Sequence, residues 1–133
     1  MRLYLDASAV VKLVQVEAES GALRQYLRHH HDDDVVSSSL SRVEVVRAVL
    51  GGGAPAVAKA RRQLARLYLV PLDRDLLDDA ATLGHAGVLR SLDAIHLAAA
   101  RRVGSKLRAV VTYDRRMADA AAALGLPVSR PSP

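Results

Sequence analysis

The chain has 133 residues, of which 50% are hydrophobic and 25% charged, and its formal net charge is +5. This length suits one domain, expected over residues 1–133, and the composition excludes a disordered or collagen-like chain. The sequence has no cysteine, which excludes disulfides, thiolate nucleophiles and cysteine-ligated zinc. It has no phenylalanine or tryptophan on which nucleic-acid bases could stack. The positive net charge favours a polyanionic partner, which would be held by ionic contacts and by the chemistry of the site rather than by stacking.

The amino-terminal stretch does not resemble an export signal, because the carboxylate of Asp6 interrupts its short apolar run. No segment approaches the roughly 18 apolar residues of a membrane span. We therefore expect a cytoplasmic protein with no membrane partner.

Short apolar runs alternate with longer segments of helical period, which is typical of βα units that build a parallel sheet. Strands are expected at 3–5, 35–36, 67–70, 109–112 and 127–128. Helices are expected at 7–13, 20–30, 41–50, 55–66, 75–84, 91–103 and 116–124, with Gly104 and Gly125 ending the last two. The pattern predicts an α/β fold with a central parallel sheet and a tail, about 129–133, that frays.

Four carboxylates occupy positions from which they can reach one end of this sheet. Asp6 closes the first strand and Asp114 follows the fourth, while Glu44 and Asp93 lie in the first turns of two helices. Ligands of parallel α/β sheets bind at the carboxyl ends of the strands. We therefore expect these four side chains to converge in the folded protein.

A cluster of carboxylates without histidine or cysteine ligands selects hard cations such as Mg²⁺ or Mn²⁺. Such ions complete their coordination with water and substrate phosphate, and they support in-line displacement at phosphorus. Together with the basic net charge, this predicts a nucleic-acid phosphodiester as substrate.

Each acid also has a purely structural interpretation, except Asp6, for which the sequence shows little structural purpose. Ser41 and Glu44 have the spacing of a capping box, in which Glu44 bonds the start of its own helix. Asp93 suits the positive end of a helix, and Asp114 suits a turn or a helix cap. At this level both interpretations stay open.

Four segments in order carry a family resemblance: residues 3–13, 39–44, 92–98 and 111–117. They resemble the successive motifs of the PIN domain and, more narrowly, those of VapC-type toxins of bacterial toxin–antitoxin pairs. The resemblance spans nearly the whole chain; segment 92–98 is its most specific part and 39–44 its least. Met117 departs mildly, because the family often carries an aromatic or other large residue there.

The resemblance implies a three-layer α/β/α fold, a Mg²⁺- or Mn²⁺-dependent endoribonuclease acting on RNA, a homodimer, and inhibition by a VapB-type antitoxin. By position it implies a catalytic quartet, Asp6, Glu44, Asp93 and Asp114, of which Asp6, Asp93 and Asp114 would hold the metal. Ser8 and Thr112 correspond to the hydroxyl residues beside the quartet. With all four acids present, an active member is expected.

Other charged residues near these motifs invite a function. Arg115 and Arg116 adjoin Asp114 and are expected to position phosphate. The tract from His29 to Asp34 is interpreted as a solvated loop rather than a metal site. His96 is interpreted as a packed helix residue, with a contact to Asp93 left open.

Three other functions compete with this one, and two of them have specific sequence requirements. An aspartyl-phosphate phosphatase using Asp6 would need a second Asp two residues on, where this chain has Ser8. A receiver-like signalling domain would need an acidic pair after the first strand and a later lysine, and neither is present. A catalytically silent PIN-like domain that only binds a partner stays open.

Overall fold

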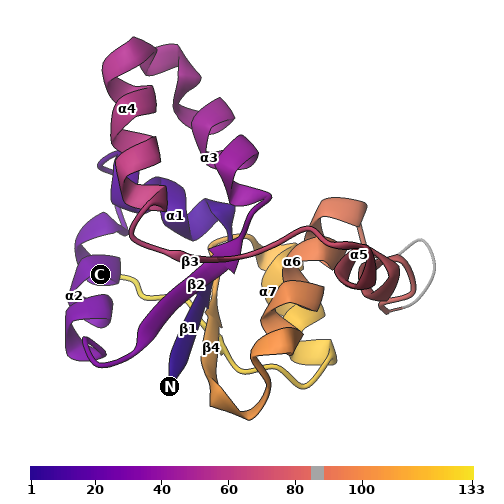
Figure 1. Ribbon diagram of the computed structural model, residues 1–133. Helices are drawn as coiled ribbons and strands as arrows, with labels where there is room; N and C mark the ends of the chain where they lie inside the picture. The colour runs from indigo at the N-terminus through magenta and orange to yellow at the C-terminus, as the bar shows by residue number, and fades with distance from the viewer. Residues whose placement is uncertain (85–88) are drawn as a thin grey trace.

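The computed structural model describes residues 1–84 and 89–133. Its five strands form one parallel sheet in the order β3-β2-β1-β4-β5 (Figure 1). The strands are β1 (Arg2–Leu5), β2 (Asp34–Ser38), β3 (Tyr68–Val70), β4 (Leu107–Val111) and β5 (Val128–Ser129). Because the chain moves outward from β1 on one side and from β4 on the other, the boundary between these two strands is the switch point where such sheets bind ligands.

Helices cover both faces of the sheet, which confirms the three-layer α/β/α fold. One face carries α1 (Ala7–Val14) and α2 (Ser20–His29), with α3 (Ser41–Val49) and α4 (Gly53–Leu64) continuing beyond it. The other face carries α5 (Arg74–Ala81), α6 (Ser91–Val103) and α7 (Arg115–Ala123). Figure 1 shows α3 and α4 projecting past the carboxyl ends of the strands.

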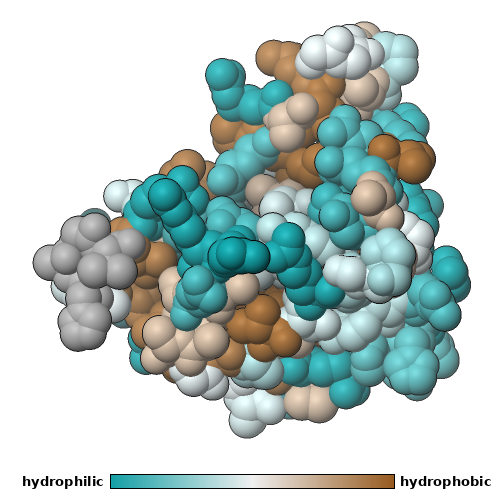
Figure 2. Space-filling view, turned by 180° about the vertical axis from the view of Figure 1, so that it is seen from behind, coloured by the Kyte–Doolittle hydropathy of each residue, from teal (hydrophilic) through white to brown (hydrophobic). Residues whose placement is uncertain are grey.

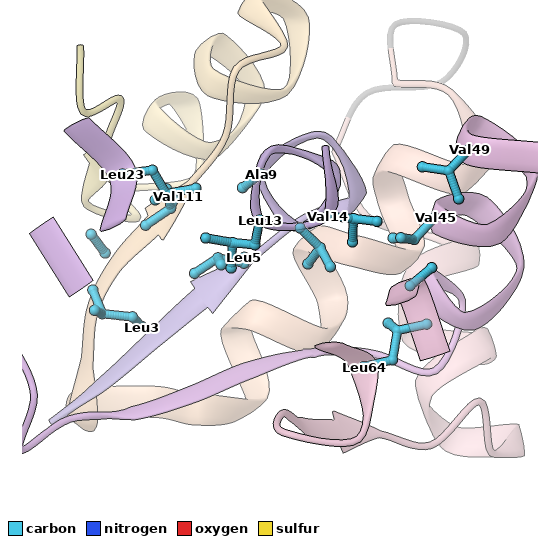
Figure 3. Close-up of a cluster of buried hydrophobic side chains, with 13 residues drawn as sticks. Leu3, Leu5, Ala9, Leu13, Val14, Leu23, Val45, Val49, Leu64 and Val111 are labelled. Carbon is cyan, nitrogen blue, oxygen red and sulfur yellow. The ribbon is translucent and has the colours of Figure 1, made fainter. Parts of the chain in front are cut away.

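Side chains of β1 alternate between two hydrophobic cores, as expected for a strand buried on both faces. Leu3 and Leu5 pack with Leu13, Val45 and others in the first core (Figure 3). Tyr4 points to the opposite face and packs with residues of α5 and α6 in the second core. The central strand is thereby fixed in register, and with it the position of Asp6 at its end.

Several element boundaries differ from the sequence expectation for identifiable reasons. Strand β2 continues to Ser38, two residues past the expected end, because Ser37 and Ser38 pair with Leu69 and Val70 of β3. The buried Ser37 hydroxyl is satisfied by donating to the Leu5 carbonyl oxygen at 2.6 Å. Helix α5 begins at Arg74 because Asp73 caps it, accepting from the Leu76 amide at 2.8 Å.

The carboxyl-terminal segment contacts β4 and the residue that follows it. Ser129 pairs with Val111 in the sheet, and the Thr112 amide donates to the Ser129 carbonyl at 3.3 Å. Further along, the Tyr113 hydroxyl donates to the Pro131 carbonyl at 2.8 Å. Contacts therefore reach as far along the tail as Pro131. Whether the tail frays in solution is not tested by them, and the fraying stays a prediction.

Among the described residues, no helix is both long and apolar enough to span a lipid bilayer. Seen from behind, the surface mixes hydrophilic and apolar atoms, with apolar atoms both on the projecting arm formed by α3 and α4 and lower on the same face (Figure 2). Val43 and Leu50 are exposed on this arm.

Candidate active site

A cleft of about 400 Å³ lies at the carboxyl edge of the sheet, at the switch point between β1 and β4. It is walled by the starts of α1, α6 and α7 and by the first turn of α3. The four acids named from the sequence all line it, as do Ser8 and six other residues: the lining residues are Asp6, Ala7, Ser8, Glu44, Arg90, Ser91, Leu92, Asp93, His96, Asp114 and Met117. The structure thus brings together four carboxylates that are distant in the sequence.

Asp6 is the most deeply placed of these acids, with only 3% of its surface exposed. Its Oδ1 accepts hydrogen bonds from the Ser8 hydroxyl at 2.6 Å and the Ala9 amide at 3.1 Å, and its Oδ2 accepts from the Thr112 hydroxyl. Burial raises the pKa of Asp6, and the bonds from Ser8 and Thr112 oppose that rise. The bond from Ala9 makes Asp6 the cap of α1, so the sequence interpretation that it has little structural purpose is wrong.

The hydroxyls of Ser8 and Thr112 connect Asp6 to the end of β4. Besides donating to Asp6, the Ser8 hydroxyl accepts from the Tyr113 amide at 3.0 Å. The Thr112 hydroxyl accepts from the Asp114 amide at 3.1 Å. Each hydroxyl therefore uses both its donor and its acceptor capacity, and together they hold the chain after β4 beside Asp6.

Glu44 is held by a buried histidine rather than by its own helix. Nε2 of His96 lies 2.6 Å from Oε1 of Glu44, and Nδ1 lies 2.7 Å from the Tyr4 hydroxyl. Burial, and to a smaller extent the charges of Asp6 and Glu44, raises the pKa of Tyr4 well above its ordinary value. An ionised carboxylate only accepts, so Nε2 of His96 carries the hydrogen that it shares with Glu44.

The capping-box interpretation of Glu44 is wrong. Helix α3 is preceded by Leu40, which makes no side-chain cap, and Ser41 is already its first residue. The Ser41 hydroxyl pairs with that of Ser37 at 2.8 Å, both being buried. In the fold, the Ser41 hydroxyl binds Ser37 and the Glu44 carboxylate binds His96, so neither forms the capping-box contact that their spacing suggests.

Asp93 and Asp114 meet at the opposite wall of the cleft. Asp93 lies in the first turn of α6, and Asp114 caps α7, its Oδ1 accepting from the amides of Arg116 at 2.9 Å and Met117 at 3.4 Å. The capping interpretation of Asp114 is therefore confirmed, yet its second oxygen still faces the cleft. That oxygen, Oδ2, accepts from Arg90 at 3.2 Å.

Arg90 is the residue of the cleft that the sequence analysis missed. Its Nε donates to Oδ2 of Asp93 at 3.0 Å while its Nη2 donates to Asp114, so one guanidinium bridges two acids from different elements. The bond to Asp93 is the main cause that raises the pKa of Arg90. Its position three residues before Asp93 in the sequence was the available signal; the partnership with Asp114, 24 residues on, had none.

Arg115 and Arg116, expected to position phosphate, are exposed at the start of α7 and do not line the cleft. The structure puts Arg90 there instead. A role for the two arginines in binding substrate outside the cleft stays a prediction.

The donor set suits a hard divalent cation, because carboxylate oxygens from Asp6, Glu44, Asp93 and Asp114 share one cleft. In the described residues, no three His, Cys, Asp or Glu side chains are grouped closely enough to hold a metal by themselves. Mg²⁺ does not require such a cage, since it is commonly held by one or two carboxylates with water and phosphate. Asp93 and Asp114 already share one cation, the Arg90 guanidinium, which shows that both can face a single positive charge.

The tract from His29 to Asp34 has a structural role at the other end of the sheet. Asp33 binds Arg108 and accepts from the amino terminus at 3.2 Å. The hydrogen bond from Arg108 is the main cause that lowers the pKa of Asp33 to about 2. The side chain of Asp33 is only 4% exposed, so at this residue the interpretation of the tract as a solvated loop is wrong; that the tract does not bind a metal stays a prediction.

Comparison with known proteins places this architecture in a family. The PIN domain matches residues 3–123. Ribonuclease VapC46 of Mycobacterium tuberculosis (strain ATCC 25618 / H37Rv) is 52% identical over 98% of each chain, and Ribonuclease VapC35 of the same organism is 43% identical over 97% of this chain and 96% of its own.

The fold has also been seen in a solved structure. The crystal structure of Mycobacterium tuberculosis VapC20, a sarcin-ricin loop cleaving toxin, superposes with a TM-score of 0.75 at 21% identity, covering 97% of this chain and 99% of that one. At this identity the likeness concerns the fold alone. Taken with the family match and the closer sequence relatives, it confirms the resemblance carried by the four motifs: the chain belongs to the PIN domain family and, within it, to the VapC ribonucleases.

Proposed function

We propose that the protein is a Mg²⁺- or Mn²⁺-dependent endoribonuclease, the toxin of a toxin–antitoxin pair. The observation that carries this proposal is the gathering of Asp6, Glu44, Asp93 and Asp114, from four separate segments, in one cleft at the switch point of the sheet. Four acids in one small space are costly unless a cation joins them. A cation there, on a basic protein, suits the phosphodiester of RNA.

Asp93 and Asp114, with Asp6 deeper in the cleft, would hold the cation. When bound, the cation lowers the pKa of a coordinated water and neutralises charge that develops on the phosphate. Ser8 and Thr112 keep Asp6 in one orientation, because its two oxygens accept from their hydroxyls. This arrangement leaves little freedom for Asp6 to turn away from the cleft.

In this proposal Glu44 accepts a proton from the attacking water. Its Oε1 is engaged by His96, whereas within the described residues its Oε2 makes no hydrogen bond. His96 in turn is fixed by Tyr4, so the carboxylate is oriented through a chain that reaches into the core. Positioned bases of this kind contribute typically about 10²–10⁴-fold to rate.

Hydrolysis by water has a product signature. The water oxygen forms a new bond to phosphorus, one bridging P–O bond breaks, and the leaving oxygen takes up a proton. The products are one phosphate-monoester end and one hydroxyl end. Attack by the neighbouring 2′-hydroxyl would instead leave a 2′,3′-cyclic phosphate.

The experiment is to digest total RNA with the purified protein in Mg²⁺ and to map both ends at each cut, with Asp6→Asn as the control for contaminating nucleases. We expect cuts with monoester and hydroxyl ends that disappear in the variant. Cyclic phosphate ends, or cuts that persist in Asp6→Asn, would contradict the proposal. Absence of any cutting would favour the silent partner-binding domain.

The phosphatase alternative receives no support from the surroundings of Asp6. Such enzymes need a second Asp two residues on. Ser8 stands at that position, and its hydroxyl donates to Oδ1 of Asp6.

The proposed partners follow from family membership. We propose that the chain acts in the cytoplasm as a homodimer and that a VapB-type antitoxin inhibits it. Co-expression with the neighbouring short reading frame, followed by co-purification and an RNA cleavage assay, tests both statements. A stable active monomer that no co-encoded protein inhibits would contradict them.

A further inference from the structure

The Arg90 guanidinium occupies two cleft oxygens that a metal ion would also use. It binds Oδ2 of Asp93 and Oδ2 of Asp114, which come from α6 and from the junction between β4 and α7. The other oxygen of Asp114 is engaged in capping α7, so the oxygen that Arg90 takes is the one left for a ligand.

This ion-pair bridge contributes little to the stability of the fold. The Arg90 side chain is 57% exposed, and ion pairs made by an exposed guanidinium contribute little to stability because water solvates the separated charge well. Helix α6 does not depend on it for a cap either, since Arg90 makes no side-chain cap bond. The Arg90 bridge can therefore be broken with little loss of stability.

We propose that Arg90 is an exchangeable group of the cleft: it is the counter-ion of Asp93 and Asp114 when no metal is bound, and it binds the RNA phosphate once a divalent cation takes those oxygens. A guanidinium and a divalent cation that bind the same two oxygens repel each other at short range, so the two compete for this position. The phosphate half of this inference rests on the proposed function; the counter-ion half does not.

The chemistry of Arg90 fits phosphate as its second partner. A guanidinium has a planar fork of donors that matches phosphate oxygens, and it keeps its charge at any physiological pH. Among the described residues lining the cleft, the only other basic side chain is His96, which Glu44 and Tyr4 already engage. Released from the acids, Arg90 stays at the rim because its backbone leads directly into α6.

One consequence is that metal and RNA help each other to bind. Metal binding frees Arg90 for phosphate, and phosphate binding keeps Arg90 away from the metal-binding oxygens. Coupling of this kind is reciprocal, so each ligand raises the affinity for the other by the same factor.

The counter-ion half is tested by calorimetric titration with Mn²⁺ in the absence of RNA. Arg90→Gln removes the competing guanidinium, and Arg101→Gln is the matched control, with the same charge change at an exposed position further along α6. We expect Arg90→Gln to bind Mn²⁺ roughly three- to tenfold more tightly than wild type, the range set by breaking a surface ion pair. An affinity equal to that of Arg101→Gln, or weaker, would overturn the proposal.

The phosphate half is tested with a fluorescent single-stranded RNA and proteins carrying Glu44→Gln, which should slow cleavage about 10²–10⁴-fold while leaving the three aspartates that would hold the metal in place. With Mn²⁺ present, adding Arg90→Gln should weaken RNA binding and lower the slope of log affinity against log salt by about one. Without Mn²⁺ the same change should have little effect, because Arg90 is then bound to the acids. Equal weakening in both conditions, or in neither, would overturn the exchange.

Arg90→Lys separates the effect of the planar guanidinium geometry from the effect of the positive charge. Lysine keeps the charge but presents one nitrogen and cannot bridge both acids, so its Mn²⁺ affinity should lie between those of wild type and Arg90→Gln. A lysine variant that matches wild type in both titrations would contradict the bridging role. If wild type cleaves RNA and Arg90→Gln keeps the same KM and the same Mn²⁺ requirement, this inference fails while the proposed function stands. If no RNA is cleaved, the proposed function fails, and the Mn²⁺ titration still decides whether Arg90 is the counter-ion of the two acids.

Discussion

Nε2 of His96 and Oε1 of Glu44 lie 2.6 Å apart although 52 residues separate them in the chain. The histidine is 2% exposed and is bound on its other side to Tyr4, so a buried polar pair supports an acid that lines the cleft. This arrangement gives His96 a structural role whose loss can be measured.

His96→Ala should lower the free energy of unfolding by about 2–4 kcal/mol, because it leaves the Tyr4 hydroxyl buried without this partner and opens a cavity. Arg101→Ala, on the exposed side of the same helix, should change it by less than about 0.5 kcal/mol. Urea denaturation of the two variants and wild type measures the difference. Equal stabilities of the two variants would contradict the role of His96.

Glu44→Gln should separate the chemistry of this acid from its structural contact. The amide oxygen of Gln can still accept from His96, so we expect the free energy of unfolding to change by no more than about 1 kcal/mol. RNA cleavage should fall about 10²–10⁴-fold, because the amide cannot take a proton from water. If the rate is unchanged in a folded variant, Glu44 only anchors His96.

Thr112→Val should damage the site through Asp6 and Asp114 together. The valine loses the hydroxyl that donates to Asp6 and accepts from the Asp114 amide, and we expect about 1–3 kcal/mol of destabilisation and slower cleavage. Thr112→Ser keeps the hydroxyl and should retain most of both properties. Thermal melts and cleavage rates of the pair measure this, and a serine variant as impaired as the valine variant would show that the methyl group is what matters.

The lowered pKa of Asp33 predicts that the stability of the fold depends on pH independently of the cleft. The pKa of Asp33 is lowered from 3.8 in an unfolded chain to about 2 by Arg108 and the amino terminus. A lowered carboxyl pKa means that the unfolded state takes up the proton first, so this stability is present above about pH 4 and is lost as the pH falls towards 2. Asp33→Asn should therefore be less stable than wild type at pH 7, with a gap that closes between pH 4 and 2; a constant gap in denaturation curves would contradict the assignment.

The strands and the four acids could be predicted because their signals are local. An apolar run followed at once by Asp6, or by Thr112 and Asp114, places a carboxylate at the end of a parallel strand whatever the rest of the chain does. Gly104 ends α6 with a φ of +71°, a conformation that glycine adopts without strain, and this too is visible in the sequence.

The contacts that depend on tertiary structure could not be predicted. Ser41 and Glu44 have the spacing of a capping box, but Ser37 and His96 take their polar groups in the fold. Arg90 gives no local signal for its bond to Asp114, because that bond exists only after α6 and α7 have packed on the same face of the sheet.

We propose above that the acidic cleft cleaves RNA with a divalent cation. The most direct test is the cleavage rate of wild type, Asp93→Asn and Asp119→Asn on one RNA, each in Mg²⁺ and in EDTA. Asp119 is exposed on α7 and provides the same charge change outside the cleft. We predict that wild type and Asp119→Asn cleave alike in Mg²⁺ and stop in EDTA, while Asp93→Asn is at least about 100-fold slower. Cleavage that continues in EDTA, or equal rates for the two variants in Mg²⁺, would contradict the account.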